Sequence, residues 1–391
     1  MPSRRRALPL LASTALVGVL AATLAGACSK EPESRFVPLP GSDDGNEDDG
    51  LIVDAGPGGP PPLDAAGLCG NQLHEIISDT PALYFVFDRS GSMAVQTPQG
   101  TAYDVVQDAA VDVVRRLGAL VSVGAAVFPD AETDTEACNP GKQVMKVTKG
   151  TPSDNGVDGY TTKTFAYQTN GDPFGGTSTS STLHGLVDKL AAIESQTLVL
   201  LLTDGAPNCN PDASCDAAHC MTNIDGICRE APDNCCAPTG IDGPSQCVDE
   251  PATVAAIEEI GALGIPVYVI GIPGTELYAD VLDAMAIAGG APQPGPPFYY
   301  RVDDLAALGD VFGAIASVAI SCEFELDGQP PEEGMTNVYL DKDVLPYDPV
   351  DGWSWSNPTT IVLHGEACAS LKNGQVMQVQ IVSGCPTEEP K

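Results

Sequence analysis

The sequence predicts an α/β fold with a doubly wound, mostly parallel sheet, helices on both faces and a small C-terminal β module. Apolar runs of strand length alternate with helical patterns over most of the chain. Two of these runs, Leu83–Phe87 and Leu198–Leu202, are apolar at every position, which is typical of strands buried on both faces. After residue 322 the alternation ends, and short strand patterns separated by turns replace it.

The composition limits the classes of partner. The 391 residues carry 53 Asp and Glu against 18 Lys and Arg, a net charge of -35. This charge argues against nucleic acids and anionic membrane surfaces, because phosphate binding requires a basic face. A content of 43% hydrophobic residues is sufficient for a core, and the length predicts two domains plus tails. Thirteen cysteines indicate an oxidising compartment.

The N-terminus has the pattern of an export signal. Arg4–Arg6 precede an apolar run over Ala7–Ala25, so residues 1–27 are predicted to be a signal peptide. An uncleaved membrane anchor is the alternative. The exit Leu24–Ser29 resembles a lipoprotein lipobox, which implies acylation of Cys28 and anchoring in the membrane at the cell surface or periplasm. Ala25–Ala27 also fits ordinary signal cleavage and free secretion. We favour lipidation because it leaves an even number of cysteines for pairing.

Residues 28–67 are acidic and rich in Pro and Gly. Such a segment buries too little apolar surface to offset its ordering entropy, so we expect a disordered tether. Asp44–Gly50 is faintly similar to a calcium-binding loop, but its glycine is displaced by one position and no helices flank it. A solvated acidic linker is the favoured interpretation.

The α/β domain is predicted to span residues 68–321, and its folded part begins near Cys69. Its first half has the following signals. Thr101 and Asp104 form a capping-box pattern before a helix with one apolar face. Val121–Phe128 predicts the next strand, and Lys142–Thr148 alternates as an edge strand does. Residues 151–174 are polar and give weak signals.

The second half continues the alternation. Helices are expected after Thr177, Pro251, Thr275 and Asp303. The remaining strands are expected at Leu198–Thr203, Ile265–Ile272 and Phe298–Val302.

An insertion at residues 206–249 contains seven cysteines. With His219, a zinc site is one interpretation. A disulfide-stapled loop is favoured, because no C-x-x-C pair occurs and the compartment is oxidising. Seven is an odd number, so one of these cysteines needs an outside partner. Cys138 is the candidate, because it follows a strand that should end on the same edge of the sheet as Asp204.

Oxygen-bearing side chains gather where strands end. Asp88, Ser90 and Ser92 follow the first buried strand, and Asp204 follows the Leu198–Thr203 strand. Thr177 lies in a glycine-rich loop before a helix. The carboxyl ends of parallel strands are where open α/β sheets bind ligands, and oxygen ligands suit Mg2+, Mn2+ or Ca2+.

The pattern D-x-S-x-S … T … D, in this order, resembles the von Willebrand factor type A (VWA) domain and its metal-ion-dependent adhesion site. The resemblance covers Pro81–Ser321 and implies a Rossmann-like sheet. It also implies that Ser90, Ser92 and Thr177 ligate Mg2+ (or Mn2+ or Ca2+) directly, while Asp88 and Asp204 act through water or hydrogen bonds. Neutral first ligands leave the cation electrophilic, so an Asp or Glu of a protein partner can complete its shell.

The resemblance therefore implies an exported adhesion or assembly module without catalytic residues. The first alternative is a structural surface protein whose ion only stabilises the fold. The second is a metal-assisted hydrolase, which would need a base beside the ion. The chain has no G-x-S-x-G and no H-E-x-x-H motif. His184 is an alternative ligand or base, although a solvated surface histidine is favoured.

Residues 322–391 are predicted to form a small disulfide-bonded β module. Strands are expected at Asn337–Leu340, Thr360–Leu363 and Gln375–Val382. We expect a Cys368–Cys385 disulfide in this module. A second disulfide, Cys69–Cys322, is expected to join the two ends of the α/β domain. Two tryptophans, Trp353 and Trp355, are two positions apart. They could form an aromatic ligand platform. The same spacing also fits a strand with one tryptophan in the core and the other at the surface.

Overall fold

The protein is described here by a computed structural model. It describes residues 72–74, 76, 80–153, 156–229, 234–238, 243–330, 333–341, 343–376 and 378–387. The predicted signal peptide and tether, with Cys28 and Cys69, lie outside the described residues. No helix in the described part of the chain has both the length and the apolar character needed to cross a bilayer.

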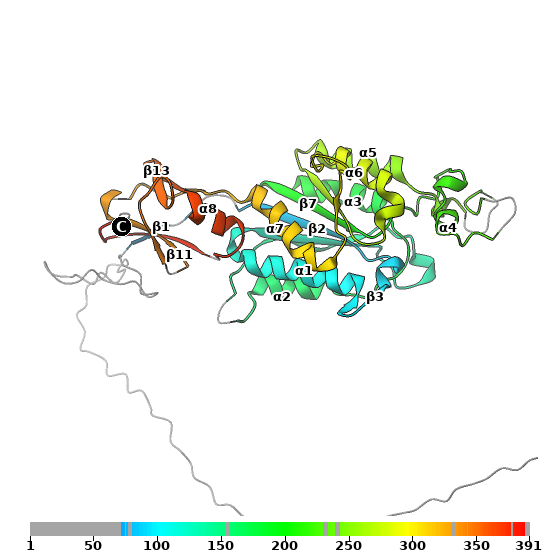
Figure 1. Cartoon of the computed structure of the whole chain (residues 1–391), viewed down its shortest axis with the longest axis horizontal. Helices are drawn as coiled ribbons and strands as arrows, with labels where there is room; N and C mark the ends of the chain where they lie inside the picture. Colours follow the sequence, from blue (N-terminus) through cyan, green and yellow to red (C-terminus); the bar gives the residue numbers. More distant parts are fainter. Residues whose placement is uncertain are drawn as a thin grey trace, which may run out of the picture. The chain divides into compact units, whose positions relative to one another are not determined.

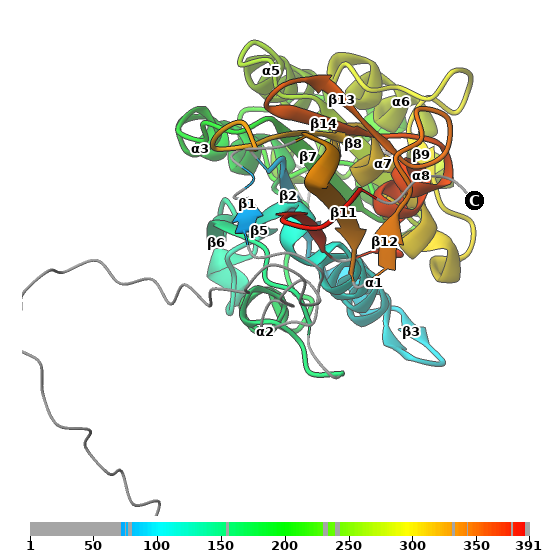
Figure 2. The ribbon, with the colours of Figure 1, turned by 90° about the vertical axis from the view of Figure 1, so that its left-hand side faces the viewer.

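A six-stranded sheet forms the centre of the α/β domain (Figure 1). Its strand order is β6-β5-β2-β7-β8-β9 (Figure 2). All neighbouring strands are parallel except β6, which pairs antiparallel with β5 at the edge. Every residue of β2, β5 and β7 is buried, as continuous apolar runs predict. The doubly wound α/β fold is therefore confirmed. The strands are β2 (Ala82–Asp88), β5 (Ser122–Phe128), β6 (Lys142–Lys149), β7 (Thr197–Thr203), β8 (Val267–Gly271) and β9 (Tyr300–Arg301).

Helices cover both faces of this sheet (Figure 1). On one face lie α1 (Ala102–Leu117), α2 (Tyr160–Thr169) and α7 (Leu308–Ala319); on the other lie α3 (Thr179–Ala191), α5 (Glu250–Gly261) and α6 (Ala279–Ala288). The predicted capping box at α1 is present: the Thr101 side chain accepts from Asp104 N, and the Asp104 side chain accepts from Thr101 N.

Helix α2 lies in the stretch that gave weak sequence signals. Its buried side chains are Phe165 and three threonines, so hydrophobic periodicity is nearly absent. Phe165 nevertheless packs edge-on against Phe85 of the central strand, with ring centroids 5.2 Å apart. A second ring, that of Phe87, lies 6.0 Å from Phe165. Two aromatic contacts and buried hydroxyls thus take the place of an apolar stripe.

The β module contains two small sheets, β1-β15-β11-β12 and β10-β14-β13 (Figure 2). Their strands are β1 (Gln72–His74), β10 (Glu323–Glu325), β11 (Thr336–Leu340), β12 (Asp343–Leu345), β13 (Trp353–Asn357), β14 (Thr360–Leu363) and β15 (Val379–Ser383), and helix α8 spans Gly365–Lys372. The sequence patterns predicted β11, β14 and β15 but not α8, β1, β10, β12 or β13. Because β1 pairs with β15, the module also takes in residues that precede the α/β domain, which corrects the predicted boundary at residue 68.

The predicted disulfides of the module are wrong. Cys322 pairs with Cys368, with an S–S distance of 1.93 Å. Cys322 leads into β10, and Cys368 lies on the helix after β14, the strand that pairs with β10. This pairing excludes both Cys69–Cys322 and Cys368–Cys385. Cys385 is itself disulfide-bonded.

The two tryptophans pack against each other. Trp353 is fully buried and Trp355 half-buried, with ring centroids 5.6 Å apart in an edge-to-face arrangement. Tyr347 packs against the other side of Trp353 at 5.0 Å. Trp353 is thus a core residue. This agrees with the prediction of one core and one surface tryptophan, and not with an aromatic ligand platform.

Candidate metal site

The carboxyl ends of β2 and β7 bring two carboxylates together. Asp88 is the last residue of β2, and Asp204 directly follows β7. These strands are hydrogen-bonded neighbours in parallel register. After Asp88 the chain enters a 3-10 turn, η1 (Gly91–Ala94), which places Ser90 and Ser92 beside the carboxylates.

Hydrogen bonds join four of the five predicted site residues. The Ser90 backbone N–H donates to Asp88 Oδ1 over 2.8 Å. The Ser92 hydroxyl donates to Asp204 Oδ1 over 2.7 Å, and the two serine hydroxyls lie 3.1 Å apart. Thr203 Oγ1 donates to Asp88 Oδ2 over 2.6 Å.

Thr177 reaches the same cluster through its backbone and neighbours. Gly91 N donates to Gly175 O over 2.8 Å, which ties the first loop to the loop of Thr177. The Thr177 backbone N–H donates to Asn208 Oδ1 over 2.8 Å, and Asn208 N donates back to Thr177 O over 2.9 Å. Since Asn208 lies four residues after Asp204, all three predicted loops meet at one edge of the sheet.

The two carboxylates are energetically unfavourable as a pair of anions. Complete burial raises the pKa of Asp88, although hydrogen bonds from Ser90 and Thr203 oppose this. Burial, and then the charge of Asp88, raise the pKa of Asp204 to about 7. Among the described residues, no Lys, Arg or His forms an ion pair with either carboxylate. Two buried carboxylates beside the hydroxyls of Ser90 and Ser92, with no ion-paired cation among the described residues, fit a hard divalent cation.

Sequence reasoning missed Thr203 and Asn208, which hold Asp88 and Thr177 in place. Thr203 directly precedes Asp204, and its position at the end of a buried strand is the signal that was available. Asn208 lies in the first residues of the insertion, where the cysteines dominate the pattern. His184, in contrast, forms an exposed pair with Glu259 at 2.8 Å. No hydrogen bond joins the His184 side chain to the five site residues within the described part of the chain.

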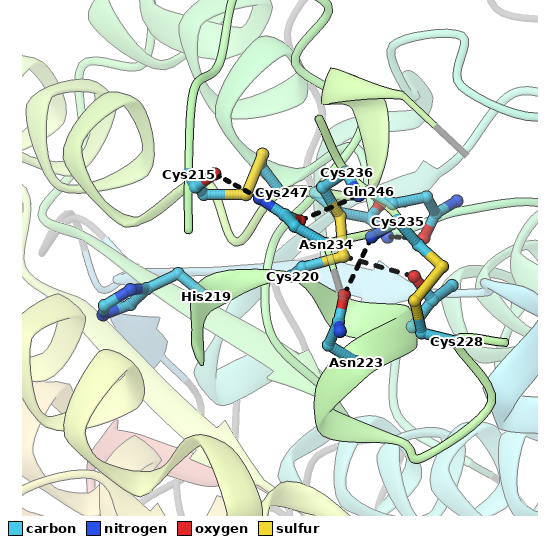
Figure 3. Close-up of a disulfide and its surroundings, with 12 residues drawn as sticks. Cys215, His219, Cys220, Asn223, Cys228, Asn234, Cys235, Cys236, Gln246 and Cys247 are labelled. Atoms are coloured by element: carbon cyan, nitrogen blue, oxygen red, sulfur yellow. Dashed lines mark hydrogen bonds between the residues drawn. A yellow bond between two sulfur atoms is a disulfide. The ribbon is translucent and has the colours of Figure 1, made fainter. Parts of the chain in front are cut away.

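The insertion is stapled by disulfides, as the favoured interpretation predicted. Cys215–Cys247, Cys220–Cys236 and Cys228–Cys235 are closed within it (Figure 3). His219 points away from the sulfurs in Figure 3, and its Nδ1 contacts Asp216 Oδ1 at 2.7 Å. The zinc alternative fails because all these thiols are consumed by disulfides.

The outside partner of the insertion is Cys138, again as predicted. Its disulfide with Cys209 has a Cα–Cα distance of 5.1 Å. This bond links the β5–β6 loop to the start of the insertion, next to the loop of Thr177.

Comparisons with known proteins give fold similarity only. No protein-family model matches the sequence, and no curated protein does. The pilus adhesin SpaC from Lactobacillus rhamnosus GG is 17% identical over 80% of this chain and 40% of its own, with a TM-score of 0.45. The minor pilin PilB from Streptococcus sanguinis is 20% identical, covering 60% of each chain, with a TM-score of 0.40.

A von Willebrand factor type A protein from Catenulispora acidiphila is 13% identical over 80% of this chain and 59% of its own, with a TM-score of 0.41. This chain therefore spans 40% to 60% of the length of these three proteins. Its function is argued below from the geometry of the site.

Proposed function

We propose that this protein is an exported adhesion or assembly module that binds a protein partner through a divalent cation. The ion is Mg2+ or, in its place, Mn2+ or Ca2+, and an Asp or Glu of the partner completes its coordination. One observation carries the proposal: Asp88 and Asp204 form a buried carboxylate pair, and no cationic side chain in the described part of the chain forms an ion pair with either. Such a pair is stabilised by a bound cation.

Each site residue has a distinct role in this proposal. Ser90, Ser92 and Thr177 supply neutral oxygens to the ion. Asp88, held by Ser90 N and Thr203 Oγ1, and Asp204, held by Ser92 Oγ, orient these groups and balance the charge. With few anionic ligands, the ion keeps enough positive charge to attract a partner's carboxylate.

The surroundings of the site restrict the partner further. The β5–β6 loop carries exposed Glu132 and Asp134, and the carbonyl of Ala137 in this loop accepts a hydrogen bond from Gly176 N over 2.7 Å, next to Thr177. The whole chain is strongly acidic as well. A partner is therefore expected to offer one carboxylate surrounded by basic side chains, since an acidic surface would be repelled.

The location follows from covalent chemistry. Five disulfides among the described residues indicate an oxidising compartment outside the cytosol. Anchoring through an acylated Cys28 remains part of the proposal. Mass spectrometry of the mature N-terminus tests it, and an unmodified thiol or a different first residue contradicts it.

The function is tested by capturing partners on the immobilised mature chain, with Mg2+ and with EDTA. We expect binding with Mg2+ that is lost with EDTA and in Asp204→Ala. Asp188→Ala, which removes an exposed carboxylate of α3, is the matched control and should bind normally. Binding that survives EDTA rules out the metal bridge.

A parallel melting experiment separates the two non-enzymatic alternatives. If EDTA abolishes capture but leaves the melting temperature nearly unchanged, the ion mediates binding. If EDTA strongly lowers the melting temperature and the amount of captured partner is the same with Mg2+ and with EDTA, the ion is only structural.

A further inference from the structure

We propose that the Cys138–Cys209 disulfide is a clamp that positions Thr177, so that the metal affinity of the site depends on this disulfide being closed. The inference rests on the proposed metal function. It assigns a positioning role to Asn208 and to a disulfide that lies against Gly176, the residue before Thr177.

The disulfide lies directly over the residue that precedes Thr177. A Cβ atom added at Gly176 would be 2.5 Å from Cys209 Sγ and 3.5 Å from Cys138 Sγ. Only a residue without a side chain fits beneath the sulfurs. The glycine-rich loop and the disulfide are therefore packed against each other, and the loop cannot move towards the sulfurs.

Hydrogen bonds connect both halves of the disulfide to the same loop. On one side, Ala137 O accepts from Gly176 N over 2.7 Å, and Asn139 O accepts from the Ser178 hydroxyl over 2.7 Å. On the other side, Asn208 forms the two-way bond with the backbone of Thr177 described above. Both neighbours of Cys138, and the residue before Cys209, are therefore hydrogen-bonded to the loop of Thr177.

The backbone at Cys209 is strained. Its φ is +71°, one of two positive values among the described non-glycine residues. Residues with a Cβ atom avoid this region, and they remain in it only where the surroundings hold them. When the disulfide opens, Cys209 is free to leave this conformation, and the adjacent Asn208 side chain then moves away from the Thr177 amide.

The disulfide is also accessible. Cys138 is exposed and Cys209 half-buried, whereas Cys220, Cys235, Cys236 and Cys247 are buried. A dithiol reductant in solution opens it by exchange: the dithiol gives up two electrons and two protons and becomes a disulfide, while Cys138 and Cys209 become thiols. Cys215 and Cys228 are half-buried, but every disulfide within the insertion has at least one buried cysteine. The more exposed clamp should therefore react first.

The test uses the full mature chain and two measurements. The first is the Mn2+ dissociation constant from titration calorimetry. The second is the rate of hydrogen exchange at the Thr177 amide in metal-free protein, which reports the clamp without any ion. For Cys138→Ser/Cys209→Ser we expect about tenfold weaker Mn2+ binding, the usual effect of removing support for a ligand, and clearly faster exchange at Thr177.

Three further variants separate the mechanism from general destabilisation. Cys138→Ser/Cys209→Gly should lose less affinity than the double serine variant, because glycine adopts a positive φ without strain. Asn208→Ala should accelerate exchange at Thr177 with the disulfide intact. Cys322→Ser/Cys368→Ser removes a disulfide of the β module and should leave both measurements unchanged.

Wild-type values for the double serine variant in both measurements would overturn the clamp, as would an equal change in the β-module variant. If the oxidised wild-type chain does not bind Mn2+, the proposed function fails, but the Thr177 exchange rates still decide whether the clamp exists.

Discussion

Thr203 Oγ1 donates a 2.6 Å hydrogen bond to Asp88 Oδ2, although 115 residues separate the two in sequence. The bond connects the last residues of neighbouring strands and lies in a fully buried environment. It holds the Asp88 carboxylate in one orientation, because Ser90 N binds the other oxygen.

Replacing Thr203 by Val removes this donor while keeping the branched shape. We expect about tenfold weaker Mn2+ binding, because a carboxylate that orients metal ligands loses its own support. Thr203→Ser keeps the hydroxyl and serves as the control. Calorimetry showing wild-type affinity for the valine variant would contradict the role of this hydrogen bond.

The metal-free protein should become more stable as the pH falls from about 8 to 5. Burial and the neighbouring Asp88 raise the pKa of Asp204 to about 7. The folded state therefore binds a proton more tightly than the unfolded state, where an Asp titrates near 3.9. Stability from this group is present at low pH and is lost as the pH rises through the folded pKa.

The measurement is urea unfolding in EDTA at several pH values, for the wild type and for Asp204→Asn. The many other acidic residues affect the pH dependence of unfolding equally in both proteins. The difference between their free energies of unfolding therefore reports the effect of Asp204. We expect the asparagine variant to be more stable than the wild type at pH 8 and to show a smaller gain on acidification. Parallel stability curves would refute the assignment.

Association with a partner should slow as salt rises. The acidic residues near the proposed metal site should attract basic side chains at long range. At physiological ionic strength, dissolved ions screen this attraction beyond roughly 8 Å. The association rate constant, measured at saturating Mg2+ from low to high ionic strength, should fall. A rate that increases with salt would indicate net repulsion and would reject the basic rim on the partner.

Cys385 should be bonded to Cys69. The ten other disulfide cysteines among the described residues pair with one another, so Cys28 or Cys69 is left, and Cys28 is predicted to be acylated. Gln72 lies opposite Ser383 in the antiparallel β1–β15 pair, so the two chain segments lead towards each other. Peptide mapping under non-reducing conditions that finds Cys385 with Cys28 would contradict this pairing.

The central sheet could be predicted because its physical cause is local. A strand buried on both faces must be apolar at every position, and Leu83–Phe87 meets that requirement without help from distant residues. The polar residues that follow it stand out for the same reason. The carboxyl ends of parallel strands meet at one edge of a sheet, so Asp88 and Asp204 could be grouped from topology. Thr177 follows no strand, and only the resemblance to the VWA pattern grouped it with them.

The features that were missed depend on distant partners. Strand β1 has three residues, and its pattern means little until β15 is beside it. The partner of Cys322 depends on how β10 and β14 pack, which spacing along the chain does not reveal. Asn208 likewise has a role only because the loop of Thr177 folds against it. Sequence patterns predict elements with local causes better than contacts between distant segments.

The pairing of β1 with β15 has a mechanical consequence. If the chain is tethered to a membrane before residue 72 and held by a partner at the metal, tension enters at β1 and passes directly into β2. Strand β2 ends at Asp88 and is hydrogen-bonded on both sides, to β5 and to β7. Pulling along its axis loads these bonds together in shear, while the short β1–β15 pair holds the start of the chain to the β module. For a chain held at these two points, the load would run through β2, in which every residue is fully buried.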